Sequence, residues 1–175
     1  MKRLFASIAL IAATLPAQAD LSVGAAAPDF STQASLGGKE FTFVLADALK
    51  KGPVVLYFYP AAFTKGCTIE AHEFADATPE FASLGATVIG VSHDGIAKLN
   101  EFSVSECRSK FAVAADPDGK VIKAYDAKMP VVSYANRTSY VITPDHKIAF
   151  VYSAMAPEKH VSLTLEAVKA WKAKK

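Results

Sequence analysis

Cys67 is the residue of this chain best placed to do chemistry. It follows a run of strand-forming residues, 53–59, and begins a segment with helical periodicity, so it falls in the first turn of a predicted helix. Backbone N–H groups without partners and the positive end of the helix dipole favour a thiolate there. Thr64 lies three residues earlier, where its hydroxyl can turn toward the sulfur, and Pro60 ends the strand. The pattern indicates an activated, partly shielded nucleophile, whereas a free cysteine is more often an inert buried thiol.

The segments around Cys67 predict one α/β domain. Three apolar runs, 53–59, 86–92 and 111–115, are typical of strands buried on both faces. The other expected elements are hairpins at 30–43 and 138–153 and helices at 46–51, 67–84, 94–110, 121–125 and 157–172, with Pro79 kinking or restarting the second helix. This order implies a mixed central β-sheet with helices on both faces and an N-terminal β-hairpin.

Residues 1–19 have charged, apolar and small residues in the order found in a cleavable signal peptide. Two positive charges precede an apolar stretch, which leads to Ala17-Gln18-Ala19, a small-x-small cleavage pattern. The apolar stretch is shorter than the roughly 20 residues of a membrane-spanning helix. We therefore expect an exported mature domain, 20–175, without stable membrane association. Its setting would be a bacterial periplasm, where two thiols can oxidise to a disulfide.

Composition excludes several other classes of protein. Lys and Arg number 19 and Asp and Glu 17, and removal of two basic residues with the signal peptide leaves 17 of each. A near-neutral chain does not suggest a nucleic-acid partner. Two cysteines are too few for a multi-disulfide scaffold or a four-cysteine zinc site. The four histidines lack zinc-ligand spacing, and we expect them on the surface or in turns: His72, His93, His146 and His160.

The residues Pro60-x-x-x-Thr64-x-x-Cys67 resemble the active-site motif of the peroxiredoxins. Glu70 stands at a further position of that family, and Arg137 lies in a segment similar to the one that carries the family's catalytic arginine. The resemblance covers nearly the whole mature chain and is closest to the bacterioferritin-comigratory (peroxiredoxin Q) subfamily, here in an exported form. It implies a thioredoxin-like fold.

The resemblance also implies thiol-dependent reduction of hydrogen peroxide and organic hydroperoxides, as antioxidant defence in the cell envelope. The Cys67 thiolate would attack the terminal peroxide oxygen and become a sulfenic acid. Arg137, Thr64 and the backbone N–H of Cys67 would hold the peroxide oxygens and stabilise charge on the leaving oxygen. No metal, haem or flavin is implied. The expected partners are the hydroperoxide and an exported thiol reductant such as a thioredoxin-like protein, and the resemblance suggests a monomer.

The chain departs from the subfamily pattern at the resolving position. Many members carry a resolving cysteine five residues after the nucleophile, where this chain has His72. Cys107, in the predicted helix 94–110, is then the candidate resolver, because some members place one in this helix and two thiols of an exported chain tend to pair. The alternative is an inert helix residue. A redox-active Cys67–Cys107 disulfide requires local unwinding if the thiols start more than ~7 Å apart.

Two further departures concern the pocket entrance. Many members have acidic residues before the threonine, where this chain has Ala62 and Phe63, and Lys65 replaces a frequent proline. These changes make the entrance more apolar and more basic, and they leave the preferred peroxide open.

Two other functions stay open at this point. A thiol–disulfide oxidoreductase of the same fold would be expected to carry a C-x-x-C pair, which this chain lacks. A non-catalytic periplasmic domain could hold Cys67 and Cys107 in a structural disulfide. After reduction, the two thiols of such a domain would react only slowly with peroxide.

Overall fold

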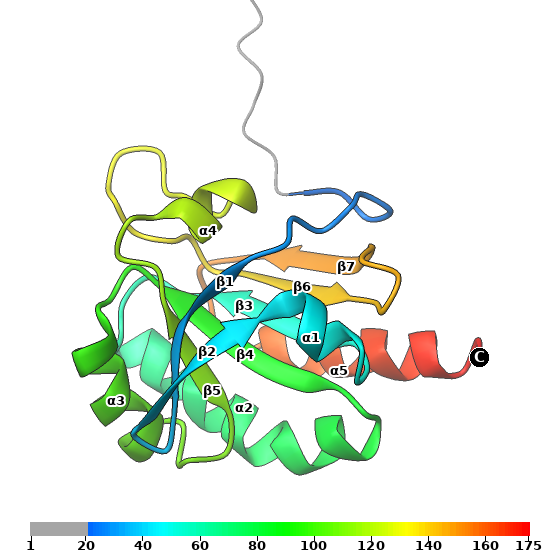
Figure 1. The fold of residues 1–175 in the computed structure, drawn as a ribbon, viewed down its shortest axis with the longest axis horizontal. Helices are drawn as coiled ribbons and strands as arrows, with labels where there is room; N and C mark the ends of the chain where they lie inside the picture. The colour runs from blue at the N-terminus through cyan, green and yellow to red at the C-terminus, as the bar shows by residue number, and fades with distance from the viewer. Residues whose placement is uncertain (1–20) are drawn as a thin grey trace, which may run out of the picture.

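The computed structural model describes residues 21–175, which form a seven-stranded mixed sheet with five helices (Figure 1). The strand order is β2-β1-β5-β4-β3-β6-β7. The predicted signal peptide, 1–19, lies outside the described residues. The strands are β1 Ser31–Leu36, β2 Lys39–Val44, β3 Val54–Phe58, β4 Thr87–Ser92, β5 Ala112–Ala115, β6 Thr138–Ile142 and β7 Ile148–Ser153. The helices are α1 Leu45–Leu49, α2 Lys65–Ser83, α3 Ile96–Ser105, α4 Lys120–Ala124 and α5 His160–Lys172.

The centre of the sheet is made by the three strands that the apolar runs predicted. β3 pairs in parallel with β4, and β4 pairs in parallel with β5, while β6 joins the other side of β3 in antiparallel orientation. Every residue of β3 and β5 is buried, as expected of strands covered on both faces. Because the parallel strands end at one edge of the sheet, the loop after β3 and the start of α2 lie at that edge.

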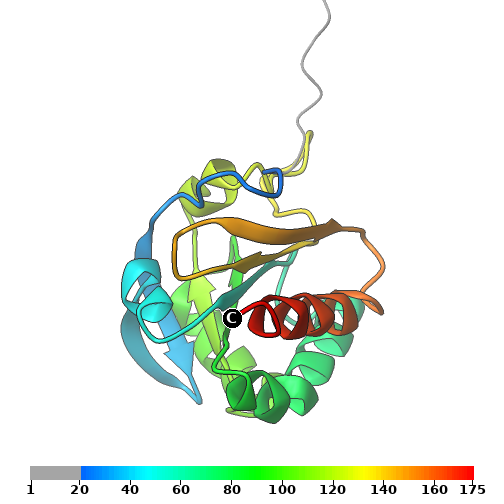
Figure 2. The same ribbon diagram turned by 90° about the vertical axis from the view of Figure 1, so that its right-hand side faces the viewer.

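Helices cover both faces of the sheet, which confirms the predicted fold class. One apolar cluster packs α2, α3 and α5 against one face through residues such as Phe74, Phe102 and Val168. The second cluster packs α1 and α4 on the opposite face through Leu45 and Ile122. Figure 2 shows the two groups of helices on either side of the sheet.

The N-terminal β-hairpin is also confirmed. β1 and β2 pair from Ser31 with Val44 to Leu36 with Lys39. The two residues between the strands are Gly37 and Gly38, with φ of 57° and 77°. A tight two-residue hairpin turn needs this left-handed backbone, which glycine adopts without a steric penalty.

Two predicted helix features differ in the structure. α2 continues as one helix through Pro79, without a restart. The predicted helix 94–110 is too long, because α3 ends at Ser105. The next residues include Arg108 and Ser109 with φ of 49° and 55°, a left-handed backbone that cannot continue an α-helix. Cys107 therefore lies in a turn after α3, and its predicted place inside the helix is wrong.

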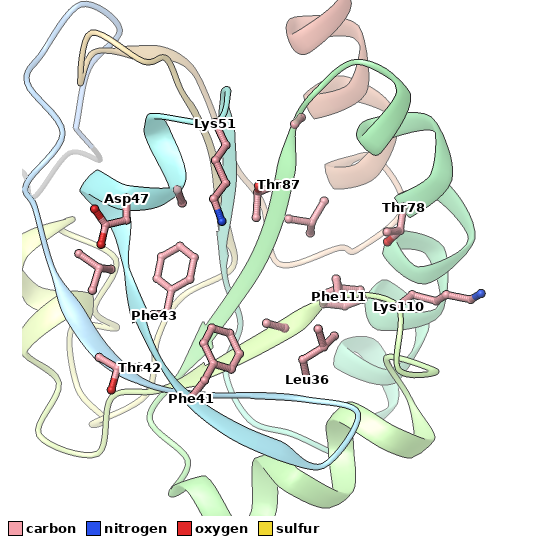
Figure 3. A pocket seen from close by; sticks show the side chains of 15 residues that line it. Leu36, Phe41, Thr42, Phe43, Asp47, Lys51, Thr78, Thr87, Lys110 and Phe111 are labelled. Carbon is pink, nitrogen blue, oxygen red and sulfur yellow. The ribbon is translucent and has the colours of Figure 1, made fainter.

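A pocket of about 460 Å³ lies between the β1–β2 hairpin, α1 and the first residues of β4 and β5. Figure 3 shows the rings of Phe41 and Phe43 in this pocket, with Leu36 and Phe111 beside them. It lies where β4 and β5 begin, whereas Cys67 follows the end of β3, and the lining includes none of the residues that the sequence proposed for chemistry. Among residues 21–175, no helix is long and apolar enough to cross a membrane.

We expect Gly90→Ala to destabilise the fold. Gly90 lies in the buried strand β4, and the ring of Tyr57 is 2.7 Å from the place where a Cβ would stand. Overpacking of this kind costs about 1–3 kcal/mol, and urea unfolding of the reduced protein measures it. Gly95→Ala is the control, because nothing lies within 4 Å of its added Cβ. Equal losses of stability in the two variants would contradict this account.

Candidate active site

Cys67 lies in the first turn of α2, as predicted. Thr64 is the N-cap residue, with an extended backbone, and the first helical hydrogen bond runs from the Thr68 N–H to the Thr64 carbonyl at 2.9 Å. The N–H groups of the three residues before Thr68, including Cys67, therefore have no partner within the helix. The Cys67 side chain is only 1% exposed. The sulfur thus meets the positive end of a 19-residue helix in surroundings that exclude bulk water.

Arg137 reaches the sulfur of Cys67 from just before β6. Its Nη2 donates to Sγ at 3.5 Å, its Nη1 donates to a carboxylate oxygen of Glu70, and its Nε donates to the Met155 carbonyl at 2.9 Å. The guanidinium is therefore fixed on three sides. Gly66 allows this approach, because a Cβ there would lie 3.1 Å from Nη2. The structure brings together Cys67, Glu70 and Arg137, which are up to 70 residues apart in the chain.

Glu70 and His160 form the inner wall of the site. Both side chains are fully buried, and the His160 Nδ1 lies 3.8 Å from Oε1 of Glu70. Burial raises the pKa of Glu70 to about 8, although the charge and hydrogen bond of Arg137 oppose the shift. Burial also lowers the pKa of His160 to about 4, so its imidazole is neutral at pH 7. A neutral Glu70 would leave the charge of Arg137 directed at the sulfur.

We expect the free energy of unfolding to decrease less with rising pH in Glu70→Gln than in the native protein. The unfolded chain releases the Glu70 proton near the ordinary value of 4.5, whereas the folded chain holds it to about 8. The folded state therefore binds more protons between these values, and its stability falls as the pH rises through this window. The lowered pKa of His160 makes the stability of the folded state rise with pH between about pH 4 and pH 6.5, and it does so equally in the native protein and in the variant. Urea unfolding at pH 5 and pH 8 should show a smaller loss in Glu70→Gln, and an equal loss would contradict the shifted pKa.

His160 was expected on the surface or in a turn, and the structure shows this to be wrong. Its side chain is 0% exposed. Its Nε2–H donates to the Ala154 carbonyl at 2.9 Å, which leaves Nδ1 to accept a hydrogen bond from the Ser139 hydroxyl at 2.8 Å. The buried residues of α5 are His160, Thr164 and Val168, one helical turn apart, so this spacing was the signal available in the sequence.

Thr64 and Pro60 frame the loop between β3 and α2. The Thr64 hydroxyl donates to the Ala61 carbonyl at 3.0 Å, so among the described residues its partner is a loop carbonyl rather than the sulfur. Pro60 is half-buried and lies two residues after Phe58, the last residue of β3. Asp94, two residues after β4, holds this loop, because its Oδ2 accepts the Ala62 N–H at 2.7 Å. Sequence reasoning missed Asp94, because its contact with this loop depends on the pairing of β3 with β4.

Cys107 belongs to the same apolar cluster as Cys67, but the two are separate free thiols. Its side chain is 0% exposed. Burial, with a smaller contribution from Glu106, raises the pKa of the Cys107 thiol well above its ordinary value. Tyr57 lies in the same cluster, and burial, followed by Cys107, raises the pKa of its hydroxyl. In this conformation Cys107 is a protected, neutral thiol.

Comparison with known proteins identifies the family of this chain. Residues 23–151 match the model of the AhpC/TSA family. The chain belongs to the AhpC/TSA family. A chloroplastic peroxiredoxin Q of Arabidopsis thaliana is 36% identical over 154 residues, covering 87% of this chain and 69% of that protein. A chloroplastic peroxiredoxin Q of Oryza sativa subsp. japonica is 34% identical over 148 residues, covering 83% of this chain and 66% of that protein.

Solved structures of AhpC/TSA relatives agree with the fold. The peroxidoxin BcpB of Mycobacterium tuberculosis is 32% identical, with a TM-score of 0.78 over 85% of this chain and 96% of that one. A mutant of PrxQ from Xylella fastidiosa is 26% identical, with a TM-score of 0.78 over 87% and 98% of the two chains. The sequence-based prediction of a peroxiredoxin-type enzyme with a thioredoxin-like fold is confirmed.

Proposed function

We propose that this AhpC/TSA protein reduces hydrogen peroxide and organic hydroperoxides with Cys67 as the nucleophile and Cys107 as the resolving residue. The observation that carries the proposal is the convergence of the Arg137 guanidinium and the α2 N-terminus on one buried sulfur. Both place positive charge where a thiolate attacks and where an oxyanion leaves. A structural cysteine would have no need of a buried guanidinium fixed on three sides.

In the first step the Cys67 thiolate attacks the terminal oxygen of the hydroperoxide. An S–O bond forms, the O–O bond breaks, and the leaving oxygen takes a proton to depart as water or an alcohol. Arg137 and the free N–H groups at the start of α2 lie where they can donate to the peroxide oxygens. Thr64, at the N-cap, can add a hydroxyl once it releases the Ala61 carbonyl. The sulfur is oxidised by two electrons to a sulfenic acid.

In the second step Cys107 attacks the sulfenic sulfur of Cys67. An S–S bond forms, the S–O bond breaks, and water leaves, so the two cysteines end as an intramolecular disulfide. Because Cys107 starts fully buried in a turn, the turn after α3 must open for this step. A dithiol reductant of thioredoxin type then supplies the two electrons that restore both thiols.

Apolar side chains around the nucleophile support organic hydroperoxides among the substrates. Phe63 and Ile69, on either side of Cys67 in the chain, are 44% and 38% exposed. Met155, whose carbonyl binds Arg137, is 55% exposed. Exposed apolar groups of this kind can cover the hydrocarbon part of an organic hydroperoxide.

The cellular setting is part of the same proposal. The signal-peptide pattern of residues 1–19 supports an exported, periplasmic enzyme that protects the cell envelope, and the subfamily resemblance suggests a monomer. Its reductant would then be an exported thiol protein, because cytosolic reductants do not reach that compartment. N-terminal sequencing of the protein purified from its native envelope should begin at Asp20, and an intact N-terminus would contradict export by cleavage.

The chemical proposal is tested by peptide mapping after peroxide treatment. Reduced protein receives one equivalent of tert-butyl hydroperoxide, is alkylated and is digested without reductant. We expect a peptide that links Cys67 to Cys107 within one chain. Cys107→Ser should instead yield a Cys67 sulfenic acid, and at excess peroxide a sulfinic acid. Disulfides only between Cys67 residues of two chains would show that an external thiol does the resolving.

A further inference from the structure

The turn that carries the second cysteine, residues 106–109, is tied to α2 on both sides of that cysteine. His72 donates to the Glu106 carboxylate, with 2.8 Å between Nε2 and Oε2. Arg108 donates to the Asp76 carboxylate, with 2.6 Å between Nη1 and Oδ1. The two α2 residues are four apart and share one face of the helix. Two polar contacts between ionisable side chains therefore bind the resolving turn to the helix that begins at the nucleophile.

The backbone of the resolving turn is strained, so these contacts matter for keeping it closed. Arg108 and Ser109 both have left-handed φ values, 49° and 55°, which side chains other than glycine disfavour. The Ser109 N–H donates to the Ser103 carbonyl at 2.9 Å, and the Cys107 N–H donates to the Phe102 carbonyl at 3.0 Å. A few hydrogen bonds, the burial of Cys107 and the two side-chain pairs thus hold the turn in place.

We propose that these two pairs, His72–Glu106 and Asp76–Arg108, which we call the latch, set the rate at which Cys107 leaves the core to meet oxidised Cys67. The inference rests on the proposed function, in which Cys107 resolves the sulfenic acid. The latch holds the closed turn in the reduced enzyme, and both pairs must break before the two sulfurs can bond. His72 would here act as a positioning residue for a resolver elsewhere in the chain.

The latch should affect only the second step of the reaction. Cys67 meets the peroxide without movement of the resolving turn, so formation of the sulfenic acid does not depend on the latch. Condensation with Cys107, which expels water, requires the open turn. A longer closed time gives a second peroxide molecule more opportunity to oxidise the sulfenic acid to sulfinic acid. The latch therefore determines how sensitive the enzyme is to inactivation by excess peroxide.

The test uses the variant with both Asp76→Asn and Glu106→Gln, which keeps the shape of the latch and removes two of its charges. Removal of one exposed ion pair changes an equilibrium by about two- to fivefold. We therefore expect disulfide formation, followed by rapid quench and mass spectrometry, to be several-fold faster. The rate of sulfenic acid formation should stay within about twofold of the native rate, and less sulfinic acid should accumulate at excess peroxide.

A second measurement follows the opening of the resolving turn without peroxide. In the Cys67→Ser background, alkylation of Cys107 reports how often the turn opens. The two latch substitutions should accelerate this alkylation several-fold. Added salt should accelerate it in the protein with an intact latch and have less effect without it, because ions screen exposed charges.

Glu80→Gln is the matched control. It breaks the pair Lys169–Glu80, 2.6 Å apart and half-exposed, which joins α2 to α5 and leaves the turn untouched. Unchanged rates of disulfide formation and alkylation in the latch variant, or an equal acceleration in Glu80→Gln, would overturn the latch. Absence of any Cys67–Cys107 bond in the native protein would overturn the proposed function and the catalytic role of the latch with it.

Discussion

Replacing Cys67 by serine should reduce peroxide reduction to the uncatalysed rate. A serine hydroxyl has the same place at the start of α2, but at neutral pH it is not ionised and cannot take up the peroxide oxygen as a sulfur does. The fold should be retained, because the side chain is nearly isosteric with that of cysteine. Stopped-flow measurement of hydroperoxide consumption provides the test.

Cys107→Ser is the control for this prediction. It removes the other thiol of the chain but leaves the helix terminus and the guanidinium in place. The first equivalent of hydroperoxide should therefore be consumed at the native rate, and only later turnovers should fail. If Cys67→Ser kept the fast first turnover and Cys107→Ser lost it, the two cysteines would have the reverse roles.

Arg137→Ala should slow peroxide reduction by a factor on the order of 10² to 10³, which is the usual cost of losing a donor to a developing oxyanion. The same change removes a hydrogen-bond partner from the buried carboxyl of Glu70, so a loss of stability of about 1–3 kcal/mol is also expected. The rate is therefore compared under conditions in which circular dichroism shows the variant to be folded. A folded variant with the native rate would exclude Arg137 from the chemistry.

Arg137→Lys separates charge from geometry at this position. A lysine retains a positive charge near Glu70 but cannot bind the sulfur, the carboxylate and the Met155 carbonyl at once, as the planar guanidinium does. We expect it to recover most of the stability and only part of the rate. Full recovery of the rate by lysine would show that charge alone is required.

The sequence predicted the fold and the placement of the nucleophile because the signals for both are local. β3, β4 and β5 are short, mainly apolar runs, and Cys67 follows β3 closely in the chain. The paired glycines of the first hairpin set its turn in the same way. Arg137 was identified because the segment around it resembles a family segment. No local pattern predicts its contact with Cys67, because the two residues are far apart in the chain.

The errors in the prediction arose where tertiary contacts decide the structure. α3 ends at Ser105 because Arg108 and Ser109 take a left-handed backbone. Neither residue is a glycine, so the sequence gives no local signal for this backbone. The spacing of His160, Thr164 and Val168 marks one face of α5, but the contact with Glu70 that buries His160 depends on how α5 packs against α2. In both cases contacts with α2 stabilise the arrangement.

In the proposed mechanism Cys67 reacts rapidly with hydroperoxide and is then resolved by Cys107. Counting free thiols over time, after reduced protein is mixed with one equivalent of hydrogen peroxide, tests it most directly. We expect both thiols to disappear within seconds, in step, and to end as a disulfide within one chain. Loss of the thiols only over hours, at the rate of an ordinary cysteine, would contradict it.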